Sequence, residues 1–168
     1  MVKMMTPGVP EDPAILAGIA KVAIHHGHLD HALRVMVKSL AGVPQEVAMH
    51  ATEGETTGRL IEQVRALARR RLGECSEMVR VRALLTRAKS LYKRRNDLLH
   101  GLWAREDIGG PATFRATRSD FGPIPPAADL ESLASDMFNL SNEMHFERQH
   151  GFLFEALGKK LLDPATKD

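Results

Sequence analysis

Apolar residues recur in alternating steps of three and four along most of the chain, the spacing that gathers side chains on one face of an α-helix. The first such segment runs from residue 12 to residue 41. Asp12 suits the N-cap, and Gly42 suits the position just past the C-terminus. Gly27 interrupts the pattern without shifting it, so we expect one long helix or two helices in line. The apolar stripe consists of Ile15, Ile19, Val22, His26, Leu29, Leu33, Met36 and Leu40.

Two more helices are predicted in the middle of the chain. One begins at Thr56 or Thr57, either of which can cap it, and ends before Gly73. The other runs from about residue 76 to residue 100, and Gly101 fits the position past its end, where φ is usually positive. One charged residue falls on the stripe of this last helix, which consists of Met78, Val81, Leu85, Ala88, Tyr92, Arg95 and Leu99.

Residues 102–126 break the helical pattern. IGGP at 108–111 is a turn signal, and FRATRS at 114–119 alternates as a half-exposed strand would. We therefore expect a small β-hairpin or an extended arm here. Helical spacing resumes near residues 127–129 and can continue through residue 157, with a break at Gly151. A short helical turn over residues 44–51 fits the connection between the first two helices.

These elements predict an all-α fold. The architecture is a bundle of four to five helices, with the small β-hairpin or extended arm inserted before the last long helix. We expect residues 1–11 to be a flexible N-terminal lead-in and residues 12–162 to form one helical-bundle domain. Residues 163–168 are expected to be a disordered tail.

Composition narrows the class of protein. With 168 residues, 43% of them hydrophobic and 26% charged, the chain is long enough and apolar enough for one globular domain. It has one cysteine, Cys75, so no disulfide can form within the chain, and we expect a reducing cytoplasm. No run approaches the roughly 18 apolar residues of a membrane span, so no membrane partner is expected.

Charge is distributed unevenly. Residues 59–105 hold thirteen Lys and Arg against four Asp and Glu, a net charge of +9, whereas residues 120–168 hold four against nine, a net charge of −5. One interpretation is a basic surface that binds nucleic acid, with salt-dependent affinity. The other is that the basic helices lie beside the acidic one. The residues of the basic surface are Arg69, Arg70, Arg71, Arg80, Arg82, Arg87, Lys89, Lys93 and Arg94.

The most unusual stretch is RRNDLLHGLW, residues 94–103, at the end of the third long helix. On a helix Asn96 and His100 share a face, and Arg95 lies roughly 140° around from His100 and about 7.5 Å along the axis. A histidine near neutrality can exchange a proton, and an arginine can hold phosphate oxygens. These groups suit cleavage of a phosphodiester bond. The other interpretation is an ordinary polar helix end, where a histidine complements the helix dipole.

The letters RNDLLH resemble the R-x4-6-H motif of the HEPN superfamily, with Asn directly after Arg as in its ribonuclease members. The resemblance covers the motif well and the rest of the chain loosely. It implies a metal-independent endoribonuclease without a cofactor, acting as a homodimer whose two motifs share one cleft. Arg95, Asn96 and His100 would then be catalytic and face a partner chain, and Asp97 would occupy a variable polar position that can modulate the pair.

The same resemblance leaves a second interpretation open, because some HEPN proteins bind nucleotides, RNA or protein partners without cutting. If the site is a ribonuclease, the basic surface is where RNA would lie, and we expect Tyr92, Lys93, Arg94 and Trp103 to bind it, the two aromatic rings by stacking on bases. Such a protein could act in defence or as a toxin, with a protein antitoxin or regulator as a further partner.

Other histidines offer a weaker possibility of metal binding. In HHGHLDH the side chains of His25, His28 and His31 are one turn apart, although no ladder of carboxylates lies near them. His26 lies on the apolar stripe and is better explained as a core or interface histidine. Glu147 and His150 have the Glu-x-x-His spacing of di-metal bundles, but the second copy that such a site needs is missing. We therefore predict no metal site.

Overall fold

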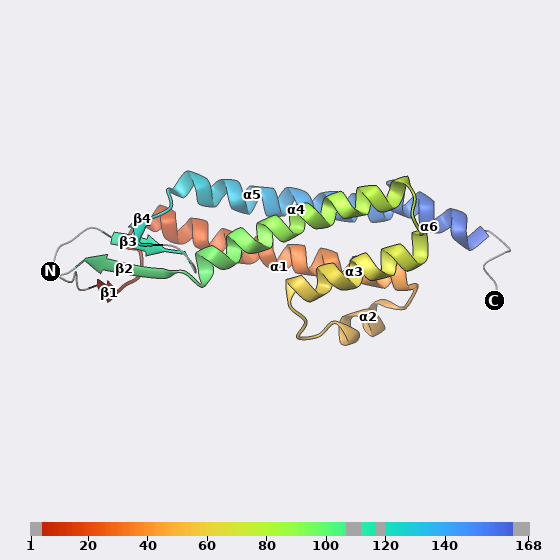
Figure 1. Cartoon of the computed structure of the whole chain (residues 1–168), viewed down its shortest axis with the longest axis horizontal. Helices are drawn as coiled ribbons and strands as arrows, with labels where there is room; N and C mark the ends of the chain where they lie inside the picture. The colour runs from red at the N-terminus through yellow and green to blue at the C-terminus, as the bar shows by residue number, and fades with distance from the viewer. Residues whose placement is uncertain (1–4, 107–111, 117–119, 163–168) are drawn as a thin grey trace.

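Three long helices form the body of the molecule, and a small sheet closes one end (Figure 1). The structure, a computed structural model, describes residues 5–106, 112–116 and 120–162. The all-α prediction is confirmed. The helices are α1 (Pro13–Ala41), α2 (Gln45–Ala51), α3 (Thr57–Leu72), α4 (Ser76–Leu99), α5 (Ala127–Gln149) and α6 (Phe152–Leu162). The strands are β1 (Met5–Pro7), β2 (Leu102–Glu106), β3 (Ala112–Arg115) and β4 (Gly122–Pro123).

The ends of the helices follow the sequence signals closely. α1 continues through Gly27 as a single helix of 29 residues. The Asp12 carboxylate accepts a hydrogen bond from the Ala14 N–H at 2.8 Å, and Gly42 ends the helix with a φ of 69°. Thr56 caps α3, and its hydroxyl accepts a hydrogen bond from the Arg59 N–H. Both caps satisfy backbone groups that a helix end leaves without partners.

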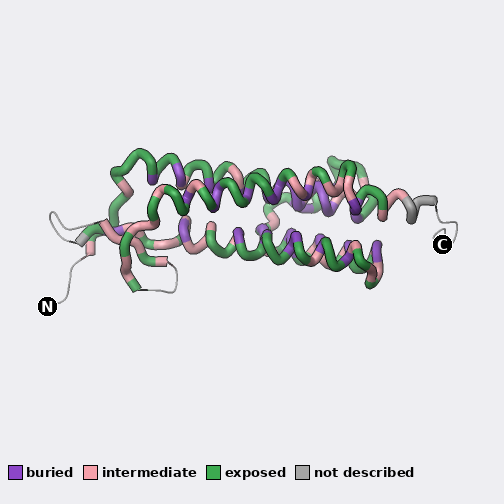
Figure 2. The backbone as a smooth tube through the Cα atoms, turned by 90° about the horizontal axis from the view of Figure 1, so that it is seen from above, coloured by how far each residue is buried: buried purple, intermediate pink, exposed green. Residues whose placement is uncertain are grey.

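The core lies between α1, α3, α4 and α5, and the buried residues follow the inward side of each helix (Figure 2). Of the eight stripe positions predicted for α1, seven are buried and Ile19 is half-buried. The most extensive contact joins α1 to α5, which run in the same direction, as the pairs Gly18 with Leu130 and His25 with Phe138 indicate. Close approach depends on Gly18, because a Cβ there would lie 2.7 Å from the Leu130 Cβ.

The sheet is larger than the predicted hairpin. Its order is β1-β2-β3-β4, and every neighbouring pair is antiparallel. The sequence did not predict a strand within residues 1–11, but β1 pairs with β2, and the Gly8 N–H donates to the Trp103 carbonyl at 3.0 Å. The predicted IGGP turn at 108–111 lies outside the described residues. β2 ends before it and β3 begins after it. The Trp103 ring packs against Phe114 with centroids 4.7 Å apart.

One prediction about the join between α4 and the sheet is wrong. Gly101 does not have a positive φ; among the described residues only Gly42, Gly54 and Gly73 do. The chain passes directly from α4 into β2, so no left-handed turn is needed. Glycine is required here for space, because a Cβ at this position would overlap the Phe114 ring.

The break predicted at Gly151 separates α5 from α6. The Glu147 carboxylate accepts a hydrogen bond from the Phe152 N–H at 2.9 Å, which provides α6 with a partner for a backbone N–H at its start. A side chain at Gly151 would overlap this carboxylate. The guanidinium of Arg80 stacks over the Phe152 ring, 4.0 Å from its centroid, so α4 also holds the new helix.

The two glycines of α1 provide a matched test of this packing. Gly27 is exposed and a Cβ there meets nothing within 4 Å, so Gly27→Ala should raise the free energy of unfolding by about 0.5–1 kcal/mol. Gly18→Ala adds the same methyl group to the same helix but pushes α1 from α5, and we expect it to lower that free energy by about 1 kcal/mol or more. Urea denaturation of both variants measures the difference, and equal shifts would contradict the packing described.

Candidate functional site at the end of α4

The C-terminal end of α4 extends beyond the helix that covers the rest of it. α3 has 16 residues and α4 has 24, which at 1.5 Å per residue is about 24 Å against about 36 Å. The two helices meet at the loop before Ser76, and α3 begins level with Tyr92, since the Tyr92 ring lies 3.6 Å from a Cβ built on Gly58. Figure 1 shows α3 beside only the half of α4 that is farther from β2. The last two turns of α4 therefore lack α3 as a cover.

A groove of about 770 Å³ follows this uncovered side of α4. We call it the α4 groove. Two of the three predicted catalytic residues, Asn96 and His100, line it, as do the predicted RNA-binding residues Tyr92 and Lys93. Its volume falls in the range of pockets that hold small ligands. The described residues that line it are Thr86, Lys89, Ser90, Tyr92, Lys93, Asn96, Asp97 and His100.

His100 is the C-cap of α4, and its side chain is exposed. Its backbone N–H donates to the Asn96 carbonyl at 2.9 Å. This hydrogen bond places His100 one helical turn beyond Asn96. The imidazole is therefore open to the groove, as a proton-transferring group must be to reach a bound molecule.

Arg95 is half-buried and is not among the residues that line the groove. Its Nη1 donates to the Asn96 Oδ1 at 2.9 Å. Its Nε is buried and has no hydrogen-bond partner within the described part of the chain. A buried donor without a partner is costly, so this guanidinium is available to an acceptor that enters from outside. Within one chain, Asn96 and His100 line the groove and Arg95 does not.

Tyr92 of the groove stacks on His26 of α1, which is 8% exposed. The His26 Nε2 lies 2.9 Å from the Thr57 Oγ1 on α3, and its ring stacks on Tyr92 of α4 with centroids 6.2 Å apart. Burial lowers the pKa of His26, and the positive charge of Arg95 lowers it further, whereas Asp30 opposes them. The interpretation of His26 as a core histidine is consistent with this burial, but its contact with the site was not predicted.

The other predicted RNA-binding residues lie in three different places. Lys93 lines the groove, where its Nζ pairs with the Asp97 carboxylate at 2.8 Å, so Asp97 does not bind Arg95. Arg94 points away from the groove toward α5. Trp103 belongs to the sheet, where it packs on Phe114 and lines a small hollow with Gly8–Pro10. The four residues predicted to bind RNA lie within twelve positions of the sequence, so their spacing alone did not show that they point to different parts of the structure.

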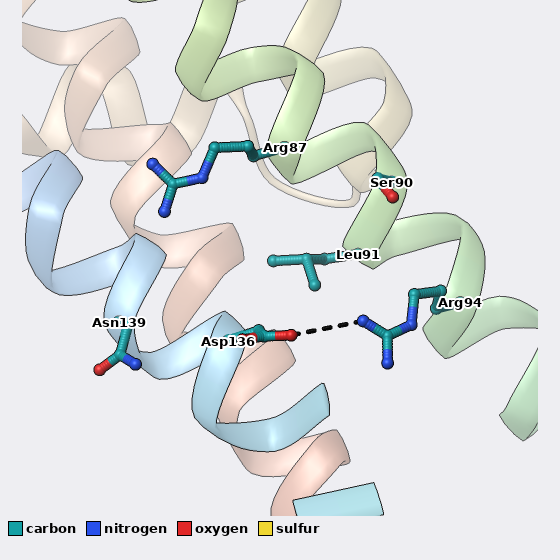
Figure 3. A pocket seen from close by; sticks show the side chains of 6 residues that line it. All are labelled: Arg87, Ser90, Leu91, Arg94, Asp136 and Asn139. Atoms are coloured by element: carbon teal, nitrogen blue, oxygen red, sulfur yellow. Dashed lines mark hydrogen bonds and ion pairs between the residues drawn. The ribbon is translucent and has the colours of Figure 1, made fainter. Parts of the chain in front are cut away.

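Arg94 helps to line a second hollow, of about 380 Å³, between α4 and α5 (Figure 3). Arg87 and Arg94 reach into it from α4, and Asp136 and Asn139 line it from α5. The Arg94 guanidinium and the Asp136 carboxylate form an ion pair at 3.4 Å. Ser90 lines both this hollow and the α4 groove, so the two flank the same stretch of helix.

Much of the basic surface is paired with acidic residues. Besides Arg94, Arg80 pairs with Glu147 at 3.3 Å and Arg87 with Glu143 at 2.6 Å, all three across α4 and α5. Their order along the two helices shows that these run in opposite directions. The uneven charge of the sequence is thus explained in good part by basic α4 lying beside acidic α5. Arg82 and Arg69 both pair with Glu74.

The histidine cluster of α1 is not assembled into one site. His25 and His28 approach each other with Nδ1 atoms 3.3 Å apart, His26 turns inward, and His31 lies near His145. The Glu147 carboxylate accepts a hydrogen bond from the Phe152 N–H and forms an ion pair with Arg80. Among the described residues its partners are therefore these two and not His150. Across residues 5–106, 112–116 and 120–162, no three His, Cys, Asp or Glu side chains are grouped so that they could hold a metal ion.

Comparison of the chain with known protein families, curated proteins and solved structures finds no match. Within the described ranges, no helix combines the length and the apolar character needed to cross a membrane. The description of the site therefore depends on the geometry of this chain.

The low pKa of buried histidines predicts how stability changes with pH. Burial is the first cause of the lowered pKa of His26 and also of His145. Below the ordinary value of 6.5 the unfolded chain binds protons that the folded chain does not, so the free energy of unfolding should fall as the pH falls below about 6.5. Urea denaturation between about pH 5 and pH 7.5 measures this slope.

Substitution of a buried and of an exposed histidine shows which residue causes this slope. His26→Phe should reduce the slope, because the residue that resists protonation is gone. His50→Phe should leave it unchanged, because the His50 side chain is 90% exposed. A slope that is equal in the two variants would show that His26 is not held neutral by burial.

Proposed function

We propose that this protein is a metal-independent endoribonuclease of HEPN type, active as a homodimer. The observation that carries the proposal is the placement of the motif. His100 and Asn96 line an open groove at the uncovered end of α4, and Arg95 beside them has a buried Nε without a partner among the described residues.

The proposed chemistry uses the 2′-OH of RNA as the nucleophile. The His100 imidazole takes the proton of the 2′-OH, whose oxygen forms a bond to the adjacent phosphorus. The bond from phosphorus to the 5′ oxygen breaks, that oxygen takes a proton from water, and the protonated His100 returns its proton to the solvent. Arg95 stabilises the negative charge that builds on the phosphoryl oxygens, and Asn96 orients Arg95 through its Oδ1. The products are a 2′,3′-cyclic phosphate and a 5′-hydroxyl.

Substrate would lie in the α4 groove. Lys89 and Lys93 provide positive charge for the phosphates, and the half-buried ring of Tyr92 provides a face for a base. Arg94 and Arg87 flank the other side of α4 and would hold a strand that continues past Ser90, provided that phosphates replace Asp136 and Glu143. The exposed ion pairs are weak enough to be exchanged in this way.

A homodimer would complete the site. In one chain His100 lines the groove and Arg95 does not. Two copies related by a two-fold axis at the ends of their α4 helices would place His100 of each beside Arg95 of the other. On this proposal the protein acts in the cytoplasm as a toxin or in defence, and a protein antitoxin or regulator would restrain it.

The proposal predicts RNA cleavage in the presence of EDTA. We expect the purified protein to cut single-stranded RNA and to leave a 2′,3′-cyclic phosphate, since no metal takes part. His100→Ala should lower the rate at least about 100-fold, because general acid–base groups contribute on this scale, and Arg95→Ala should do the same. Gel analysis of labelled RNA measures both the rate and the ends.

Each variant has a matched control within the chain. His150 is the exposed C-cap of α5, as His100 is of α4, so His150→Ala should cut RNA like the unchanged protein. Arg148 of α5 is half-buried and, like Arg95, has a buried Nε without a hydrogen-bond partner among the described residues, so Arg148→Ala should likewise retain the rate. Cleavage that survives both His100→Ala and Arg95→Ala would exclude this function. A protein that binds RNA or nucleotide in the groove without cutting it would instead be the non-catalytic module.

A further inference from the structure

Two histidines of α1 lie as close together as two ligands of one metal ion. The Nδ1 atoms of His25 and His28 are 3.3 Å apart. Metal–nitrogen bonds of about 2.0–2.1 Å that meet at the tetrahedral angle separate two imidazole nitrogens by about 3.3–3.4 Å. The right-angled bonds of a square-planar ion would separate them by only about 2.8–3.0 Å. The observed distance therefore matches a tetrahedral ion before either side chain moves.

The fold holds these two rings in place. Residues 25 and 28 are one turn apart near the middle of α1, which is a single helix of 29 residues, so their backbone is already ordered. The His25 ring packs on Phe138 of α5 with centroids 5.2 Å apart. The His28 ring meets the His25 ring edge-on with centroids 5.3 Å apart. A metal ion would thus bind here without the cost of ordering a loop.

Access and charge also suit a cation. His28 is exposed and His25 is half-buried, so solvent reaches the pair. Burial lowers the pKa of His25, the charges of His28 and Lys21 lower it further, and Glu131 opposes them. At neutral pH the His25 ring is therefore uncharged, which is the form that binds a metal. Lys21 would repel a cation, but its Nζ pairs with the Glu131 carboxylate at 2.6 Å.

The pair provides two of the four ligands that a tetrahedral ion takes. Sequence spacing offered His31 as a third, but its ring lies near His145 of α5, with centroids 6.0 Å apart. In the described part of the chain, no third His, Cys, Asp or Glu side chain joins the pair to complete a metal site. Two positions would stay open to water or to a donor from another molecule, unlike the closed four-ligand site of a structural zinc.

We propose that His25 and His28 form a two-histidine chelate for Zn²⁺, which binds through the Nδ1 of each ring. Zinc accepts imidazole ligands and prefers the tetrahedral geometry that the 3.3 Å separation fits. Sequence spacing did not predict a metal site, because the spacing does not show which ring nitrogens face each other.

This site is separate from the proposed ribonuclease site. His26, which stacks on Tyr92 of the α4 groove, lies about 100° around α1 from His25 and about 160° from His28. A zinc ion held by the pair would take no part in the cleavage proposed above. The inference can therefore be tested whether or not the protein cuts RNA.

Calorimetric titration of the full chain, without a histidine tag, with Zn²⁺ at about pH 7.5 should show one ion bound per chain. His28→Asn should lower the affinity at least about 10-fold, because loss of an outer partner of a metal ligand already costs about 10- to 100-fold. His31→Asn is the matched control, since His31 is an exposed histidine one turn further along the same helix, and it should bind Zn²⁺ like the unchanged protein. The absence of Zn²⁺ binding, or an equal loss in both variants, would overturn the inference.

NMR spectra of the histidine ring nitrogens identify the atoms that bind. Zn²⁺ should shift the Nδ1 signals of His25 and His28 together, and it should leave the signals of the exposed His50 unchanged. His28→Asn should also greatly reduce the shift at His25, because the chelate is lost. Binding through Nε2, or a shift at His25 that is the same with and without His28, would indicate adventitious binding to single surface histidines and would overturn the chelate.

Discussion

The contact between His26 and Thr57 sets the geometry on which the candidate site depends. It joins the middle of α1 to the first residue of α3, and so determines where α3 begins along α4. Since α3 is shorter than α4, fixing it there leaves the last two turns of α4 without a cover. The same histidine stacks on Tyr92, which lines the groove. One buried contact is therefore next to the groove and also leaves the end of α4 open.

Many charged side chains of the protein form ion pairs within the chain itself. Three arginines of α4 pair with carboxylates of α5, which neutralises much of the basic surface that the sequence displays. Because these pairs are exposed, each contributes little to stability, and a polyanion could displace them. Among the described residues that line the α4 groove, the lysines and arginines are Lys89 and Lys93, and Lys93 already faces Asp97. Any RNA affinity should therefore be modest and salt-dependent.

Helix ends and core faces were predictable from the sequence because they depend on local rules. Asp12, Gly42 and Thr56 act as caps where expected, and the stripe of α1 is buried nearly throughout. The strand β1 was not predictable, because a three-residue edge strand depends on its partner β2 and carries no periodicity of its own. The stacking of His26 on Tyr92 was also not predictable, since it joins residues 66 positions apart on two different helices.

The central claim is that Arg95 of one copy and His100 of another act on the same phosphate. Mixing inactive Arg95→Ala protein with inactive His100→Ala protein tests it most directly, because half of the randomly assembled dimers would then contain one intact site out of two. A shared site in a two-fold symmetric dimer predicts RNA cleavage in EDTA at about a quarter of the unchanged rate. A mixture that stays as inactive as its two components would contradict a shared site.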